Sequence, residues 1–208
     1  LNTTISLYAY CTIEENNSGK ISINSLDLKE YLEFDNGIDL FPIDNKLDII
    51  KQCLNYFINN GYISRYDSFS ISTFCDVPPG TGLGSSSTLI VSIINCINKW
   101  LDLNLDEYEV AKISYNVERV IMKISGGKQD QYAAAFGGFN FIEFHSSDKT
   151  IVNPIRLKKW VLNELQASIL IFNLGTSRSS DKIIREQKKS IKENEKSLAS
   201  MHKIKEHA

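Results

Sequence analysis

Strand-like and helix-like segments interleave along these 208 residues, and this order predicts an α/β or α+β fold. Residues 68–75 alternate in polarity as a half-buried strand does, and residues 85–100 are apolar almost all round, as a buried helix is. A glycine-rich run joins the two. With 42% hydrophobic and 23% charged residues, the chain has an ordinary globular composition and enough length to bury a core without disulfide or metal staples.

The other elements are predicted from the same periodicities. Residues 3–13 and 20–25 are predicted to be two strands of a hairpin around the turn at 16–19, whereas residues 27–36 show no clear period and stay unassigned. Asp106 and Glu109 form a capping-box pattern at the start of a helix. Further patterns predict helices over 44–59, 106–122, 129–135 and from 177 onward, and strands over 139–144, 149–153 and 167–174.

Charge and cysteine spacing exclude several classes of protein. A net charge of −2 argues against a general binder of nucleic acids or membrane surfaces, which needs a basic excess. No apolar run approaches the roughly 18–20 residues of a membrane span, and no secretory leader is visible. Cys11, Cys53, Cys75 and Cys96 are spaced too irregularly for a redox pair or a zinc knuckle, so we expect reduced, mostly buried thiols in a reducing cytoplasm.

The two ends of the chain and one internal stretch bear on domain organisation. The sequence begins within a strand-like pattern and stops within a charged helical pattern, which indicates a fragment of a longer protein. Polar residues and Pro154 separate two better-patterned segments near 146–160. We therefore expect a first domain over residues 1–158 and the beginning of a second over 159–208.

The glycine-rich run has a specific physical use. Glycines at 80, 82 and 84 let the backbone turn tightly and approach a ligand, and the serines that follow open the buried helix. Amides of the turn and of the first helical turn then converge on one point, where the helix dipole favours an anion such as an oligophosphate. The spacing fits neither the P-loop, since no Lys precedes a Ser or Thr here, nor the dinucleotide fingerprint, since serines follow Gly84.

This run resembles the second motif of the GHMP kinases, the superfamily of galactokinase, homoserine kinase and mevalonate kinase. Ser87 stands where the family most often has Ala. The resemblance implies an α+β fold, with a first domain like the second domain of ribosomal protein S5 and the start of a ferredoxin-like second domain. It also implies that the loop binds ATP through Pro79, Gly80, Thr81, Gly82, Leu83, Gly84, Ser85, Ser86 and Ser87.

Two acidic residues downstream are candidates for the chemistry. A kinase acting on a hydroxyl needs ligands for Mg²⁺ and a group that positions or deprotonates the hydroxyl. Taken alone, Glu118 on a helix and Asp130 near a helix start would be a surface residue and a cap. The resemblance implies instead that Glu118 and Ser86 bind Mg²⁺ and that Asp130 is the catalytic residue, orienting the substrate hydroxyl or accepting its proton.

The segment from Gly126 to Gly138 is more particular than the superfamily pattern. It resembles the branch whose members phosphorylate D-glycero-D-manno-heptose 7-phosphate at the anomeric hydroxyl to give the 1,7-bisphosphate. The resemblance extends over about residues 1–190 and implies a sugar-binding set of Gly126, Gly127, Gln129, Asp130 and Arg178. Arg178, at the start of the last predicted helix, has the forked geometry that suits a phosphate.

Two other interpretations stay open. The chain could be another sugar kinase of the superfamily, similar to galactokinase or fucokinase, or a non-catalytic homologue that binds a sugar as a sensor. The first and third family motifs are not found in these residues. We therefore expect the 208-residue chain alone to bind ATP weakly and to turn over poorly. The expected partners are ATP and a sugar phosphate, not nucleic acid or membrane.

Overall fold

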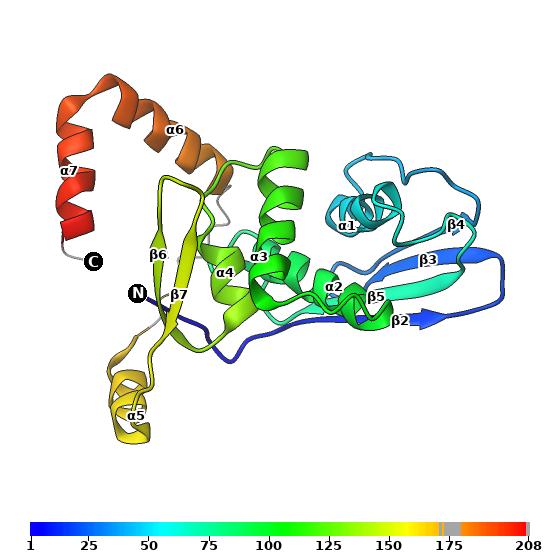
Figure 1. Cartoon of the computed structure of the whole chain (residues 1–208), viewed down its shortest axis with the longest axis horizontal. Coiled ribbons are helices and arrows are strands. Elements are labelled where there is room, and N and C mark those ends of the chain that lie inside the picture. Colours follow the sequence, from blue (N-terminus) through cyan, green and yellow to red (C-terminus); the bar gives the residue numbers. More distant parts are fainter. Residues whose placement is uncertain (171, 173–179, 207–208) are drawn as a thin grey trace.

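The computed structural model describes residues 1–170, 172 and 180–206 and has an α+β architecture, which confirms the predicted fold class (Figure 1). Its strands form two separate sheets. One has the order β2-β5-β3-β4 and is built from Ala9–Glu15, Phe69–Cys75, Lys20–Ser25 and Glu30–Asp35. The other has the order β1-β6-β7 and is built from Asn2–Thr3, Phe139–Phe144 and Thr150–Pro154.

The predicted hairpin of residues 3–13 and 20–25 is wrong in its pairing. β5 lies between β2 and β3, antiparallel to the first and parallel to the second. β5 carries Phe69 and Ile71, both fully buried, and a central position buries such side chains better than an edge. β3 instead forms a hairpin with β4, which lies in the unassigned stretch 27–36, and residues 2–3 form β1 in the other sheet.

Two helices cover the larger sheet and build the main core with it. α1 (Asp48–Asn59) and α2 (Ser85–Trp100) pack against each other, and α2 lies on β2 and β5. Both helices follow the predicted ranges closely, although α1 begins four residues later because Leu47 takes a left-handed conformation. The core buries Leu54, Phe57, Ile90 and Ile94 completely.

The predicted helix over 106–122 changes its winding partway. α3 (Glu107–Tyr115) is α-helical, and the next turn, η1 (Asn116–Ile121), is π-helical. α4 (Gln129–Phe136) follows the loop after η1 and packs against α3 and α2. This group of helices lies between the two sheets in Figure 1, so residues of α2, η1 and α4 meet near the middle of the molecule.

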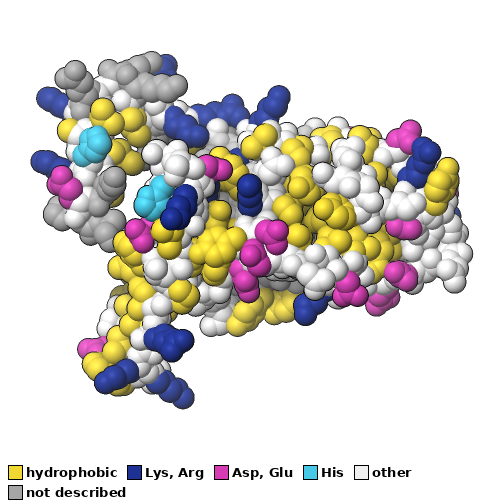
Figure 2. Space-filling view, viewed as in Figure 1, with side chains coloured by type: hydrophobic (Ala, Val, Ile, Leu, Met, Phe, Trp, Pro, Cys, Tyr) yellow, Lys and Arg dark blue, Asp and Glu magenta, His cyan; other side chains and the backbone are white. Residues whose placement is uncertain are grey.

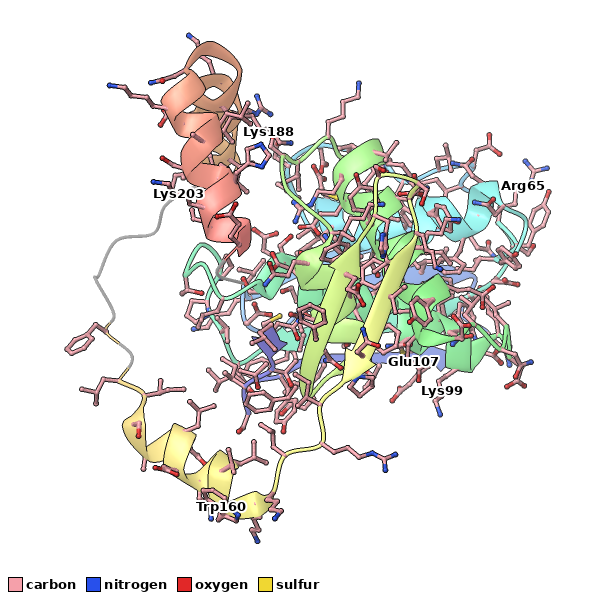
Figure 3. The ribbon with its side chains drawn as sticks, turned by 60° about the vertical axis from the view of Figure 1, so that its left-hand side comes forward. Arg65, Lys99, Glu107, Trp160, Lys188 and Lys203 are labelled. Carbon is pink, nitrogen blue, oxygen red and sulfur yellow. The ribbon has the colours of Figure 1, made fainter. Side chains whose placement is uncertain are left out.

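Three C-terminal helices project beyond the smaller sheet (Figure 1): α5 (Lys159–Ser168), α6 (Ser180–Glu193) and α7 (Glu195–Glu206). The strand predicted over 167–174 is wrong in the described residues, because α5 continues through Ser168 and residues 169, 170 and 172 are not in a strand. Good helix formers decide the conformation here, since no residue of α5 is buried against a sheet. Figure 3 shows Trp160 on this helix, and its side chain is 62% exposed.

The long helix predicted from 177 onward is interrupted at Asn194. The side-chain oxygen of Asn194 accepts a hydrogen bond from the amide of Lys196, so it caps α7 and separates it from α6. The domain boundary expected after residue 158 falls between β7 and α5 and stays a prediction. None of the helices in the described part of the chain combines the length and apolarity needed to cross a membrane.

All four cysteines are free, as predicted. Only Cys53 is fully buried, whereas Cys11, Cys75 and Cys96 are half-buried, so the expectation of mostly buried thiols was too strong. These three thiols line the cavity described below.

The capping box at the start of α3 is confirmed and yields a stability prediction. The Asp106 carboxylate accepts from the Glu109 amide at 2.8 Å, and the Glu109 carboxylate accepts from the Asp106 amide at 3.0 Å. Asp106→Ala should lower the unfolding free energy by about 1 kcal/mol, because the Glu109 amide loses its side-chain acceptor. Thermal unfolding should show a midpoint roughly 2–4 °C lower. Lys112→Ala, an exposed change on the same helix, is the control, and equal midpoints for both variants would contradict the prediction.

Candidate active site

A cavity of about 770 Å³ lies between the N-terminal segment, α2 and α4. Its wall includes residues 2–5 and 7–9 on one side, the glycine-rich turn and α2 on another, and the start of α4 on the third. Six of the predicted site residues line it: Gly82, Leu83, Gly84, Ser85, Gln129 and Asp130. The fold therefore brings the turn at 82–85 and the acidic residue at 130 to one cavity.

The last residue of the glycine-rich turn, Gly84, directly precedes α2. Gly84 has φ 73° and is the N-cap of α2, a left-handed conformation that glycine adopts without strain. Because glycine has no side chain to cap the helix, no side chain accepts from the first-turn amides. Free amides and the positive end of the helix dipole thus lie together at the cavity wall, an arrangement that favours an anion.

The start of the glycine-rich run lies farther from the cavity. Pro79, Gly80 and Thr81 belong to the turn that approaches α2 but are not among the residues that line the cavity. The Thr81 hydroxyl donates to the Pro78 carbonyl at 3.2 Å. Thr81 therefore stabilises the turn in this structure.

A buried carboxylate lies directly behind the start of α2. Glu118 is only 2% exposed. One of its oxygens accepts from the Ser86 hydroxyl at 2.7 Å, and the other accepts from the Ser87 hydroxyl at 2.7 Å and from Gln131 Nε2 at 2.5 Å. Arg119 Nη1 lies 3.5 Å from the first oxygen. The carboxylate thus joins α2, η1 and α4 in one network.

The π-helical turn holds two neighbouring residues that contact the same group. In η1, Glu118 and the next residue, Arg119, both contact the Ser87 hydroxyl. The wider turn is closed by a bond from the Met122 amide to the Val117 carbonyl, five residues back. π-Helical turns are rare and occur frequently at functional sites.

Asp130 lies in the first turn of α4, across from Gly84. An ideal Cβ built on Gly84 would lie 3.6 Å from Asp130 Cγ, an ordinary contact distance. The side chain is open to the cavity, yet the protein atoms around it desolvate the carboxylate and raise its pKa. The positive charge of Arg119 opposes this rise in pKa, and the negative charge of Glu118 adds to it.

The remaining predicted site residues have different surroundings. Gly126 and Gly127 are not part of the cavity wall but pack against Arg119, whose Nε donates to the Gly127 carbonyl at 3.2 Å. Gln129 lines the cavity beside Asp130. Arg178 lies outside the described residues.

Sequence reasoning missed two residues of this network. Gln131 is fully buried and donates to Glu118, and Arg119 contacts Glu118, Ser87 and the loop after η1. The sequence signal that could have found them is that each directly follows a predicted site residue, Asp130 or Glu118. Nothing in the periodicity indicated the π-helical turn that contains Arg119.

The oxygen atoms near Ser86 suit a hard cation. Mg²⁺ prefers oxygen ligands and in kinases is typically held by one or two protein groups together with substrate phosphates and water. The Ser86 hydroxyl and one Glu118 oxygen lie 2.7 Å apart beside the glycine-rich turn, an arrangement that fits this pattern. Within the described residues, no cluster of three His, Cys, Asp or Glu side chains could hold a metal without other ligands.

Comparison with known proteins agrees with this geometry. Residues 48–138 match the model of the GHMP kinases N terminal domain. The chain is 45% identical over all 208 residues to D-glycero-alpha-D-manno-heptose 7-phosphate kinase of Campylobacter jejuni, and it spans 60% of that protein's length.

Solved structures show the same fold. A D-glycero-D-manno-heptose 1-phosphate kinase from Bacteroides thetaiotaomicron is 46% identical, with a TM-score of 0.76 over 80% of this chain and 54% of that one. A galactokinase of Lactococcus lactis, 18% identical, has a TM-score of 0.62 over 83% and 53% of the two chains and shares the fold. By its sequence and its fold, the chain contains a GHMP kinase N-terminal domain over residues 48–138.

Proposed function

We propose that the protein is an ATP-dependent sugar kinase that phosphorylates the anomeric hydroxyl of D-glycero-D-manno-heptose 7-phosphate to give the 1,7-bisphosphate. The observation that carries the proposal is that an uncapped helix start and the Asp130 carboxylate line the same cavity, with the Glu118–Ser86 pair beside them. Phosphoryl transfer needs these three parts: a phosphate cradle, a cation site and a group that addresses the nucleophile.

The turn and the first residues of α2 would hold the nucleotide. Amides of residues 84–87 point toward the space in front of the helix, where the dipole favours the phosphates of ATP. Ser86 and Glu118 would ligate Mg²⁺ there. The ion, when bound, neutralises charge that develops on the transferred phosphate.

Asp130 would act on the sugar. The anomeric oxygen attacks the γ-phosphorus, the bond from that phosphorus to the β–γ bridging oxygen breaks, and ADP leaves. The hydroxyl proton passes to the Asp130 carboxylate, whose raised pKa makes it a better proton acceptor than an ordinary aspartate. Asp130 and Gly84 line the same cavity, so the hydroxyl and the phosphate can meet in the cavity beside them.

The acceptor is assigned from the relatives. Two proteins at 45% and 46% identity are named as heptose phosphate kinases, one for the 7-phosphate and one for the 1-phosphate. We assign the sugar to Gln129 and Asp130 on the cavity wall, with Gly126, Gly127 and Arg178 as further contacts. We also propose residues 1–158 as the ATP-binding domain, residues 159–208 as the beginning of a second domain, and the cytoplasm as the location, which four free thiols favour.

The test is a phosphate-transfer assay on the natural full-length protein with Mg²⁺, ATP and a panel of acceptors. The panel contains D-glycero-D-manno-heptose 7-phosphate, the 1-phosphate, galactose and fucose, and ³¹P NMR identifies the position that is phosphorylated. We expect the 7-phosphate to yield the 1,7-bisphosphate, with kcat/KM at least tenfold above that of any other acceptor. Reaction of a free hexose while heptose 7-phosphate stays inert would overturn the assignment of the substrate. Sugar binding without transfer to any acceptor would favour a sensor.

A further inference from the structure

The side chain of Arg119 connects three segments of the candidate site although it does not line the cavity. It is only 10% exposed. Its Nε donates to the Gly127 carbonyl at 3.2 Å, its Nη1 to the Ser125 carbonyl at 3.5 Å, and its Nη2 to the Ser87 hydroxyl at 3.5 Å. All three nitrogens of the guanidinium are thus used, two on the loop after η1 and one on α2.

Charge adds to these hydrogen bonds. Arg119 Nη1 lies 3.5 Å from the nearer oxygen of Glu118, which is 2% exposed. A carboxylate this deeply buried is costly unless a cation and hydrogen-bond donors compensate it. The same cation opposes the rise in pKa of Asp130, so it acts on both carboxylates of the site.

The space around Gly126 shows how closely the loop and the guanidinium pack. An ideal Cβ on Gly126 would lie 2.3 Å from Arg119 Cζ and 2.5 Å from Nε, closer than real atoms approach. A Cβ on the adjacent Gly127 would meet nothing within 4 Å. Neither residue has a positive φ, so this difference reflects space and not backbone strain. A side chain at 126 would therefore displace the guanidinium, whereas one at 127 would not.

Two residues, Lys128 and Gln129, separate Gly127, whose carbonyl is anchored, from Asp130 in the first turn of α4. The position of the loop therefore sets where α4 begins. We propose that Arg119 is a positioning residue: it holds the Gly126–Gly127 loop against Glu118 and Ser87 and so places Asp130 across from the start of α2. This inference deepens the proposed function and rests on it.

The test is a double-mutant cycle in the full-length protein, with kcat and KM measured for MgATP and the heptose phosphate. Arg119→Ala and Gly126→Ala should each lower kcat about 10–100-fold with KM for MgATP changed less than threefold, because the carboxylate is displaced while the phosphate-binding turn is kept. The double variant should be no worse than Arg119→Ala alone, because the added Cβ then fills the vacated space. Arg119→Lys should recover only part of kcat, since lysine lacks the fork.

Gly127→Ala is the matched control for coupling. Gly127→Ala and Arg119→Ala should act independently, because a Cβ at position 127 meets no guanidinium atom. The fold-loss of kcat in the double variant should therefore equal the product of the two single fold-losses. If the losses of Gly126→Ala and Arg119→Ala also multiply, or if Arg119→Ala keeps kcat, the role of Arg119 is overturned while the kinase assignment stands. A wild-type protein that transfers no phosphate to any acceptor overturns the proposed function and this inference with it.

Discussion

Replacing Glu118 by alanine is expected to lower the free energy of unfolding by about 3–5 kcal/mol, the cost of removing one partner from a buried ion pair. The carboxylate accepts from Ser86, Ser87 and Gln131, and these donors would lose their acceptor at once. Arg119, 10% exposed, would also lose its nearest counter-charge. Since small domains are stable by only about 5–15 kcal/mol, the variant should unfold at a much lower temperature.

Glu118→Gln separates the loss of charge from the loss of volume. The amide keeps one acceptor oxygen in the network, so the fold should survive with a smaller loss of stability than in Glu118→Ala. A neutral amide is a poor ligand for Mg²⁺, so kcat/KM should fall by about 10²–10³-fold. Thermal unfolding and steady-state kinetics at several Mg²⁺ concentrations measure the two effects.

The control for Glu118 is Glu107→Gln, an exposed change in the first turn of α3. It removes the same charge from the protein without touching the network, and kcat/KM should stay within threefold of the wild type. A Glu118→Gln variant with wild-type turnover and wild-type dependence on Mg²⁺ would contradict the proposed role of this carboxylate.

Asp130→Asn is expected to abolish most of the turnover and, at the same time, to raise thermal stability. Removing a general base typically costs about 10²–10⁴-fold in rate, and MgATP binding should be kept because the phosphate-binding turn is unchanged. The protein atoms around the carboxylate desolvate it and raise its pKa, so the charged form is less favourable in the folded than in the unfolded chain. A neutral amide of the same shape removes this penalty.

The dependence on pH follows from the direction of the shift in pKa. Because the pKa of Asp130 is raised in the folded state, the folded state binds more protons between the unfolded pKa and the folded pKa. Unfolding free energy therefore falls as pH rises through this window, and the penalty is fully present above it. The gain in melting temperature of Asp130→Asn should thus be largest near neutral pH and should shrink as pH is lowered toward 4.

Asp35→Asn, an exposed change on β4, is the control for the loss of one carboxylate charge. Differential scanning calorimetry at pH 5 and 7 gives the stability of each variant, and a fluorescent ATP analogue reports nucleotide binding. A lower melting temperature for Asp130→Asn than for the wild type at pH 7 would show that the carboxylate stabilises the fold, contrary to this prediction.

Local sequence alone determined a large part of the molecule. The alternation in β5, the all-apolar pattern of α2 and the capping box at Asp106 each predicted the element that the structure contains, because burial and capping are dictated by neighbours within one or two turns. The glycines before Ser85 likewise predicted a tight turn into a helix start, since the conformation of a turn depends on local backbone geometry. Anion binding there stays a prediction.

Tertiary structure decided what depends on distant partners. β5 separates β2 from β3 because burial of its side chains favours the centre of the sheet, and no local turn signal records this. The π-helical turn at Glu118 and Arg119, the buried Gln131 and the packing of Gly126 against a guanidinium arise where α2, η1 and α4 meet. The charge of the buried carboxylate and the space beside the guanidinium are matched there by side chains and glycines from separate segments. Only the folded protein therefore shows which neighbours the two acidic residues have.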